Sequence, residues 1–264
     1  MIGQKKLKAK IQGLKVANLF PHFSIFVGPA GSGKKTFLRE NFDGIWLEDV
    51  KVDSIRKLID MAYKVRERTF IIPDADNMSN AAKNALLKVV EEFPNNNYFI
   101  MTLTNEDNTL ETIKSRAIMF RMDEYTKQDL VTYAKSKKDL TVNELDIMYS
   151  ICMTPGDIDI LLNYDITEFF RYVNLVIDNI AQVSTANALK IPNKVGEDGY
   201  DLQLFLRPIG SVCIRRIINM DFDEHSSYMS AYNVTARYLR ELQITGINKQ
   251  MLIDNWVLAM RGVL

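Results

Sequence analysis

The chain has 264 residues, of which 47% are hydrophobic and 25% are charged, a composition typical of a soluble globular protein with one large or two modest cores. Lysine plus arginine and aspartate plus glutamate number 33 each, so the total charge gives no sign of a nucleic-acid-binding protein. The charge is unevenly distributed, because every basic side chain from Lys5 to Arg39 precedes the first acidic residue, Glu40. Such a basic end suits an anionic ligand, and it also suits a solvated first helix.

Cys152 and Cys213 are the only cysteines, and they stand far apart in no metal-ligand spacing. This usage is typical of buried thiols in a reducing compartment. The sequence shows no signal-peptide pattern and no apolar run of transmembrane length. We therefore expect a cytoplasmic protein with no membrane partner.

Short apolar runs alternate with amphipathic helical patterns in the first half of the chain. The apolar runs cover residues 23–27, 45–47, 69–72, 98–103 and 117–120. Helical faces cover residues 55–63 and 82–90, and Ser79 stands at the N-cap position of the second. Five apolar strands separated by helices predict a parallel sheet with helices on both faces.

Strand patterns stop near Met122, and helical patterns fill the rest of the chain. Residues 126–162 predict three short helices, the last with Thr154 as N-cap and Pro155 in its first turn. Long helices are predicted from about Ile166 onward, with a connection at residues 191–200. Their broad apolar stripes predict exposed aromatic patches that seek a partner. The large side chains in these stripes include Phe169, Phe170, Leu204, Phe205 and Trp256.

A phosphate-loop motif, Gly-Pro-Ala-Gly-Ser-Gly-Lys, occupies residues 28–34, between the first strand and a helix. Glycines in such a loop let backbone N–H groups point at phosphates, and the lysine reaches the terminal phosphates. The sequence therefore predicts a nucleotide-binding site at this position. Its residues are Gly28, Gly31, Ser32, Gly33, Lys34, Lys35 and Thr36.

Two elements that normally hold Mg²⁺ depart from the usual pattern. Lys35 occupies the position of the metal-binding Ser or Thr, and the hydroxyl of Thr36 comes one helical position late. After the third strand, Pro73 replaces the acidic metal ligand. Asp74 either keeps the second acidic charge of the site on a shorter side chain or belongs, with Asp76, to a solvated acidic turn. We expect that hydrolysis is lost, that no metal site forms, and that the Lys35 ammonium lies near the metal position.

These motifs, taken together and in order, resemble those of AAA+ clamp-loader subunits. The matching residues are Ile2-Gly3-Gln4, the loop at 28–36, Asn84–Lys88 with Glu91-Glu92, Thr112–Arg116 and Thr154–Asp157. The chain looks like the delta-prime type of subunit from bacterial DNA polymerase III, and it is similar to the small subunits of replication factor C. The specific motifs cover roughly residues 1–163.

The resemblance implies a fold, a set of ligands and a set of partners. The expected fold is an α/β P-loop AAA+ domain with a five-stranded parallel sheet at residues 1–123, a helical lid at 124–163, and an all-α collar domain at 164–264. The expected nucleotide is ATP or ADP, bound weakly or not at all and not hydrolysed. The implied partners are other clamp-loader subunits, a sliding clamp and primer-template DNA, within a DNA polymerase III holoenzyme.

The resemblance also implies roles for individual residues. Arg116 stands where the family carries the arginine that enters a neighbouring subunit's ATP site, and an arginine there neutralises charge on the transferred phosphoryl group. The alternative for Arg116 is a helix-end arginine bonded to carbonyl groups. Thr104 matches the polar sensor of the site, while Asp159 replaces the arginine sensor of the lid. The four-cysteine zinc module of the delta-prime type is missing, so we expect no zinc.

Two other functions stay open at this point. The chain is an active AAA+ motor subunit in one of them, although Lys35, Pro73 and Asp159 argue against it at three places. In the other it is an AAA+ adaptor or regulator outside replication.

Overall fold

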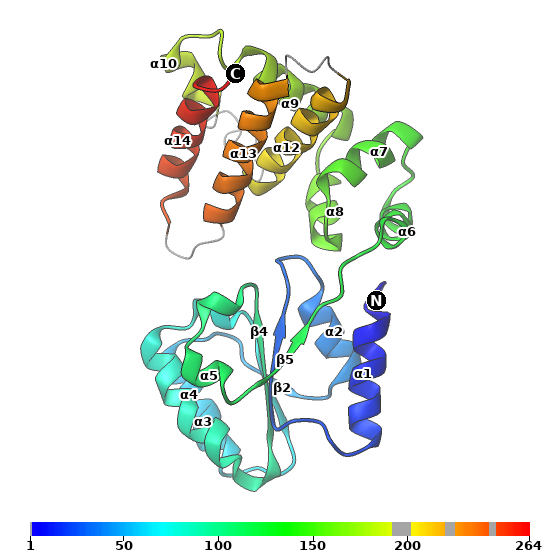
Figure 1. Cartoon of the computed structure of the whole chain (residues 1–264). Helices are drawn as coiled ribbons and strands as arrows, with labels where there is room; N and C mark the ends of the chain where they lie inside the picture. Colours follow the sequence, from blue (N-terminus) through cyan, green and yellow to red (C-terminus); the bar gives the residue numbers. More distant parts are fainter. Residues whose placement is uncertain (1, 192–201, 220–224, 243–246) are drawn as a thin grey trace. The chain divides into compact units, whose positions relative to one another are not determined.

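The computed structural model describes residues 2–191, 202–219, 225–242 and 247–264 (Figure 1). Contacts within the chain define two compact units, Met1–Asp129 and Leu130–Leu264. Apart from Ile191, the connection predicted at residues 191–200 lies outside the described residues.

The first unit is built around a five-stranded sheet. Its strands are β1 (Phe23–Val27), β2 (Ile45–Trp46), β3 (Thr69–Ile72), β4 (Tyr98–Leu103) and β5 (Ile118–Arg121). Its α-helices are α1 (Lys5–Val16), α2 (Lys34–Asn41), α3 (Val52–Ala62), α4 (Asn80–Glu92) and α5 (Glu111–Lys114). Short 3-10 helices are η1 (Ala75–Asn77), η2 (Pro94–Asn96) and η3 (Glu106–Asn108).

The strands follow the order β2-β3-β4-β1-β5, and every neighbouring pair is parallel. The five-stranded parallel sheet predicted from the sequence is therefore confirmed. Because parallel strands end at one edge of a sheet, the loops after β1, β3 and β4 come together there. This edge carries the phosphate loop and the segments that would serve it.

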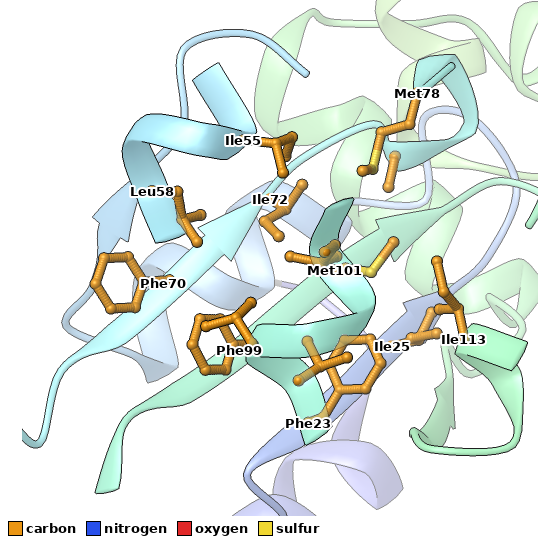
Figure 2. Packing of buried hydrophobic residues seen from close by; sticks show 14 of the residues in the cluster. Phe23, Ile25, Ile55, Leu58, Phe70, Ile72, Met78, Phe99, Met101 and Ile113 are labelled. Carbon is orange, nitrogen blue, oxygen red and sulfur yellow. The ribbon is translucent and has the colours of Figure 1, made fainter. Parts of the chain in front are cut away.

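Helices cover both faces of the sheet (Figure 1). On the face of α3, α4 and α5, the strands contribute side chains such as Ile25, Phe70 and Phe99 to one buried cluster. Figure 2 shows Phe70 near Leu58 of α3, and Ile25 beside Ile113 of α5. On the face of α1 and α2 the buried cluster includes side chains from every strand except β2, with Trp46 of β2 packed at its margin. Successive strand residues point to opposite faces, so a strand buried on both faces must be apolar throughout.

In this unit, the ends of helices and strands predicted from the sequence agree closely with those in the structure. The Ser79 hydroxyl accepts a hydrogen bond from the Ala82 N–H, which confirms the predicted N-cap of α4. Strand β5 begins one residue later than predicted, because the N–H of Ala117 still bonds to the Lys114 carbonyl at the end of α5.

The described part of the second unit consists of helices. They are α6 (Lys127–Lys137, which begins in the first unit), α7 (Val142–Ile151), α8 (Pro155–Leu161), α9 (Ile166–Asn179), α10 (Thr185–Ala188), α12 (Leu202–Asn219), α13 (His225–Glu241) and α14 (Lys249–Arg261). The three short helices predicted between residues 126 and 162 are confirmed as α6, α7 and α8. Thr154 caps α8 as predicted, and its side chain and that of Asp157 bond each other's backbone N–H groups.

The aromatic stripes of the second unit lie in its interior. Phe169, Phe205 and Trp256 are fully buried, the indole N–H of Trp256 donates to the Thr235 hydroxyl at 3.2 Å, and Leu204 is buried as well. Phe170 is half-buried, and the expectation that Phe169, Leu204, Phe205 and Trp256 form exposed patches is wrong. The four helices α9, α12, α13 and α14 bury them against one another, so these residues give no argument for a partner.

An ion pair ties the short helices of this unit to the longer ones. The guanidinium of Arg207 on α12 lies 2.6 Å from the carboxylate of Asp157 on α8, and both side chains are largely buried. The same carboxylate accepts hydrogen bonds from the N–H groups of Met153 and Thr154, both at 2.9 Å. A buried carboxylate with these partners keeps the N-terminus of α8 in place against α12.

Helices long and apolar enough to cross a membrane are absent from the described ranges.

Both cysteines are buried free thiols, as the sequence predicts. Burial raises the pKa of the Cys152 thiol to about 12 and that of Cys213 to about 11.

Because the thiolate is the reactive form, we expect both to react with a thiol reagent at pH 8 at least about 100-fold more slowly in the native protein than in denaturant. Because the thiol pKa is higher in the folded state than in the unfolded state, the folded protein holds its thiol protons more tightly. This stabilisation is complete below the unfolded-state pKa and is lost as pH rises toward the folded-state pKa, so the free energy of unfolding should fall in alkali. Rapid native-state labelling of either thiol would contradict this.

Candidate nucleotide-binding site

The phosphate loop leaves the end of β1 and leads directly into α2. The N–H of Gly28 donates to the Leu103 carbonyl of β4 at 3.1 Å, which fixes the start of the loop to the sheet. A Cβ atom on Gly28 would lie 2.7 Å from Cγ of Met122, so only glycine fits there. Gly31 and Gly33 have φ values of 75° and 79°, in the left-handed region that glycine adopts without strain. Gly28 is therefore required by close packing, and Gly31 and Gly33 are required by their positive φ.

Several backbone N–H groups of the loop have no backbone acceptor in the part of the chain that the structure describes. The first regular bond of α2 runs from the N–H of Phe37 to the carbonyl of Gly33 at 2.8 Å. Within the described residues, no backbone acceptor is assigned to the N–H groups of Gly33, Lys34, Lys35 and Thr36 that precede it. These groups and the helix N-terminus together favour an anion. The side chain of Thr36 is exposed on this first turn.

The side chain of Lys34 turns back onto the loop. It is only 8% exposed, and its ammonium donates to the carbonyls of Gly28 at 2.5 Å and Pro29 at 3.0 Å. Burial lowers the pKa of Lys34, and the nearby carboxylates of Asp76 and Asp74 partly oppose that shift. In the described structure no carboxylate lies within ion-pair distance of this ammonium. A buried cation with carbonyl partners alone is suited to receive an anion.

Lys35 and Asp74 form an ion pair across the two sequence elements that would hold a metal. The ammonium lies 2.5 Å from the carboxylate, and the two side chains are 46% and 48% exposed. Asp74 has a left-handed φ of 51°, and its N–H donates to the hydroxyl of Thr102 at 2.9 Å. This turn directs the carboxylate toward the start of α2. The sequence had left Asp74 open as a solvated acidic residue, and the structure brings it to the loop.

These residues do not fit Mg²⁺. A magnesium site in a phosphate loop takes a hydroxyl from the helix and a carboxylate from the third strand. Here the helix supplies the ammonium of Lys35, the strand supplies Pro73, and the remaining carboxylate is already paired with that ammonium. The described residues include no group of three or more potential metal-ligating side chains.

Thr104 is held by Asp76 at the neighbouring strand end. Its hydroxyl donates to Asp76 at 2.7 Å, and its N–H donates to the same carboxylate at 2.8 Å, with a further bond from the N–H of Asn105 at 3.3 Å. The carboxylate thus joins the turn after β3 to the end of β4. The sequence gave Asp76 no such role, because its partners lie 28 and 29 residues away.

The N-terminal residues and the segment after β5 close the other side of the loop. The side-chain amide of Gln4 donates to the Asp123 carbonyl and accepts from the Asp123 N–H, both at 2.7 Å. Gly3 has a φ of 69°, and a Cβ there would meet the Tyr125 ring at 2.9 Å. The Tyr125 hydroxyl donates to the Ser32 carbonyl at 2.9 Å. The Tyr125 contact has no local signal in the sequence, since 93 residues separate the partners.

Arg116 lies just after α5, away from the loop of its own chain. Its guanidinium pairs with the Glu91 carboxylate of α4 at 2.6 Å and donates to the Thr112 carbonyl at 2.7 Å. In this single chain it is therefore bonded at a helix end, as the alternative interpretation expected. Its side chain is still 37% exposed.

Asp159, in the second unit, has partners there. The Tyr133 hydroxyl donates to both of its carboxylate oxygens, at 3.0 and 2.8 Å, and the Lys137 ammonium lies 3.6 Å away.

The chain is similar to several known proteins. The family model described as "DNA polymerase III, delta subunit" matches residues 44–126. Replication factor C small subunit 2 of Pyrobaculum aerophilum is 25% identical over 187 residues, which are 62% of this chain and 58% of that protein. DNA polymerase III subunit gamma of Buchnera aphidicola subsp. Schizaphis graminum is 29% identical over 114 residues, 39% of this chain and 31% of that protein.

Over part of its length, the chain is similar to clamp-loader proteins. A solved structure, the AAA domain of FIGL-1 in complex with ADP, covers 69% of the chain with a TM-score of 0.50 and 14% identity, a likeness that shows the fold. The expected AAA+ fold is thereby confirmed. The chain spans less than two thirds of the length of the relatives named above.

The two aspartates after β3 should contribute differently to the stability of this clamp-loader-like chain. Asp76→Asn removes one charged acceptor that joins two strand ends, so the free energy of unfolding should fall by about 1 kcal/mol or more. Asp74→Asn removes an exposed ion pair and tolerates the left-handed turn, so its effect should stay within about 0.5 kcal/mol. Urea unfolding of both variants measures this, and an equal loss in the two would contradict the assignment.

Proposed function

We propose that the chain is a non-hydrolysing, delta-prime-like subunit of a DNA polymerase III-type clamp loader. In this role it completes a ring of AAA+ subunits and supplies Arg116 to the ATP site of a neighbour. Its partners would be the other clamp-loader subunits, a sliding clamp and primer-template DNA. The proposal draws on the similarity to clamp-loader proteins and on the local chemistry of two places in the first unit.

One observation carries the loss of hydrolysis, namely the ion pair of Lys35 and Asp74. Phosphoryl transfer requires a metal that bridges the phosphate oxygens and a carboxylate that orients the attacking water. The position of one metal ligand holds a cation, and the position of the other holds Pro73. Of the two aspartates in the turn after β3, Asp74 is paired with Lys35 and Asp76 is bonded to Thr104, so neither requirement is met.

The surroundings of Arg116 support its role toward a neighbour. Its own phosphate loop follows β1, whereas Arg116 follows α5 and keeps 37% of its side chain exposed. The ion pair with Glu91 is exposed and of low energy, so the guanidinium can exchange it for a phosphate. The bond to the Thr112 carbonyl holds the side chain along the helix end. The planar fork is thus oriented before a partner arrives.

The two alternatives differ from this proposal in what they require of the loop and of Arg116. An active motor subunit needs the metal ligands that Lys35 and Pro73 displace. An AAA+ adaptor outside replication needs no arginine for a neighbour, so dependence of a clamp-loading complex on Arg116 separates it from the proposed role.

The isolated chain should release phosphate from ATP no faster than its Lys34→Ala variant. The reason is the missing metal site, and the variant measures the background because it lacks the loop ammonium. A coupled phosphate-release assay in the presence of Mg²⁺ tests this. A turnover of about 1 s⁻¹ or more, abolished by Lys34→Ala, would show a working ATPase.

Arg116→Ala should lower ATP hydrolysis at one site of a complex reconstituted with clamp-loader partners, by about 10³-fold or more at that site. Arg116→Lys should restore little, because an ammonium does not reproduce the planar guanidinium. Assembly of the complex, followed by gel filtration, should be unchanged.

Lys114→Ala is the matched control, since Lys114 lies on the same short helix and pairs with Glu111 at 2.7 Å. It should leave hydrolysis unchanged. Normal hydrolysis and clamp loading with Arg116→Ala would reduce Arg116 to a helix-end residue and end the proposed role.

A further inference from the structure

The phosphate loop and its lysines carry an inference about how the site is filled. It deepens the proposed function, because it concerns the same non-hydrolysing loop. The loop keeps the features that bind phosphate while the features that bind Mg²⁺ are replaced. A site of this kind either does not bind nucleotide or binds it without Mg²⁺.

The donors of the loop point to an anionic ligand. Lys34 is a buried ammonium that is bonded to two backbone carbonyls. The Ser32 hydroxyl is buried, and no hydrogen-bond partner is found for it among the described residues. It lies inside the loop, 3.0 Å from the position that a Cβ on Gly28 would take. A buried hydroxyl and a buried ammonium both gain from a phosphate oxygen.

The Lys35 ammonium stands in the place of the metal. It comes from the first turn of α2, the position that normally gives the metal its hydroxyl ligand, and it meets the carboxylate that follows β3. Both partners are about half exposed, so the pair is weak and a phosphate can replace the carboxylate at small cost. The backbone N–H of Asp74 stays bonded to Thr102 during this exchange, and the exposed carboxylate can rotate away from the phosphate, which leaves the Lys35 charge available.

Charge balance favours a phosphate chain without its metal. Nucleotides ordinarily reach phosphate loops as Mg²⁺ complexes, in which the metal neutralises the β- and γ-oxygens. Here Lys34 and Lys35 supply two positive charges from the protein itself. A bound Mg²⁺ would meet the Lys35 ammonium directly, and like charges at that distance repel.

We propose that this loop binds the phosphate chain of a nucleoside di- or triphosphate in metal-free form, with the Lys35 ammonium in place of Mg²⁺. The fixed cation holds the phosphates and does not activate water. Nucleotide in this site therefore stabilises the subunit without being consumed.

Isothermal titration of the full chain with ADP, ATP and tripolyphosphate tests the inference, in EDTA and in excess Mg²⁺. Binding in EDTA should be equal to or tighter than binding in Mg²⁺. Lys35→Thr should weaken metal-free binding by about tenfold or more. Lys57→Thr, an exposed lysine on α3, should leave the affinity unchanged. Tripolyphosphate binding as tight as ATP binding would show that the phosphates alone are recognised, which the inference allows.

Absence of binding in EDTA, or binding that requires Mg²⁺, would overturn the inference, as would unchanged metal-free affinity in Lys35→Thr. These results leave the ring role intact, because that role depends on Arg116 and is read from hydrolysis by the reconstituted complex. Conversely, if Arg116→Ala left ATP hydrolysis by the reconstituted complex unchanged while the chain still bound metal-free nucleotide, only the ring role would be overturned.

Discussion

The ion pair of Lys35 and Asp74 joins the two segments that carry the chemistry of a phosphate-loop site. It can form because the sheet is parallel and places the end of β1 and the end of β3 at one edge, with β4 between them. The same edge brings Thr102 beneath the turn of Asp74 and Thr104 beside Asp76. The ion pair therefore follows from the residues at two strand ends that the parallel sheet brings together.

The two aspartates of this turn, Asp74 and Asp76, have different roles. Asp76 has become a structural acceptor for the end of β4, whereas Asp74 faces the phosphate loop. The loop meanwhile keeps its steric requirements, since Gly28 is packed against Met122 and the Ser32 carbonyl is bonded by Tyr125. These contacts fix the shape of the loop. The buried Ser32 hydroxyl and the buried Lys34 ammonium are the reason to treat it as a binding element.

Sequence patterns predicted the sheet, the helical second half and the helix caps at Ser79 and Thr154, because each of these depends on local periodicity and capping chemistry. Three features were not predictable locally. The contact of Tyr125 with Ser32 spans 93 residues, and the role of Asp76 depends on which strands are neighbours. The aromatic stripes were misjudged as exposed, because periodicity gives the face of a helix but does not say what covers that face.

The central claim is that a lysine ammonium, and no metal, meets the phosphates in this loop. A crystal structure of the chain with ADP and Mn²⁺, recorded with anomalous diffraction, tests it most directly. The account predicts phosphate oxygens within hydrogen-bond distance of the Lys35 ammonium and no anomalous peak between Lys35 and Asp74. A manganese peak coordinated by Asp74 and the nucleotide, with the Lys35 side chain turned away, would contradict it.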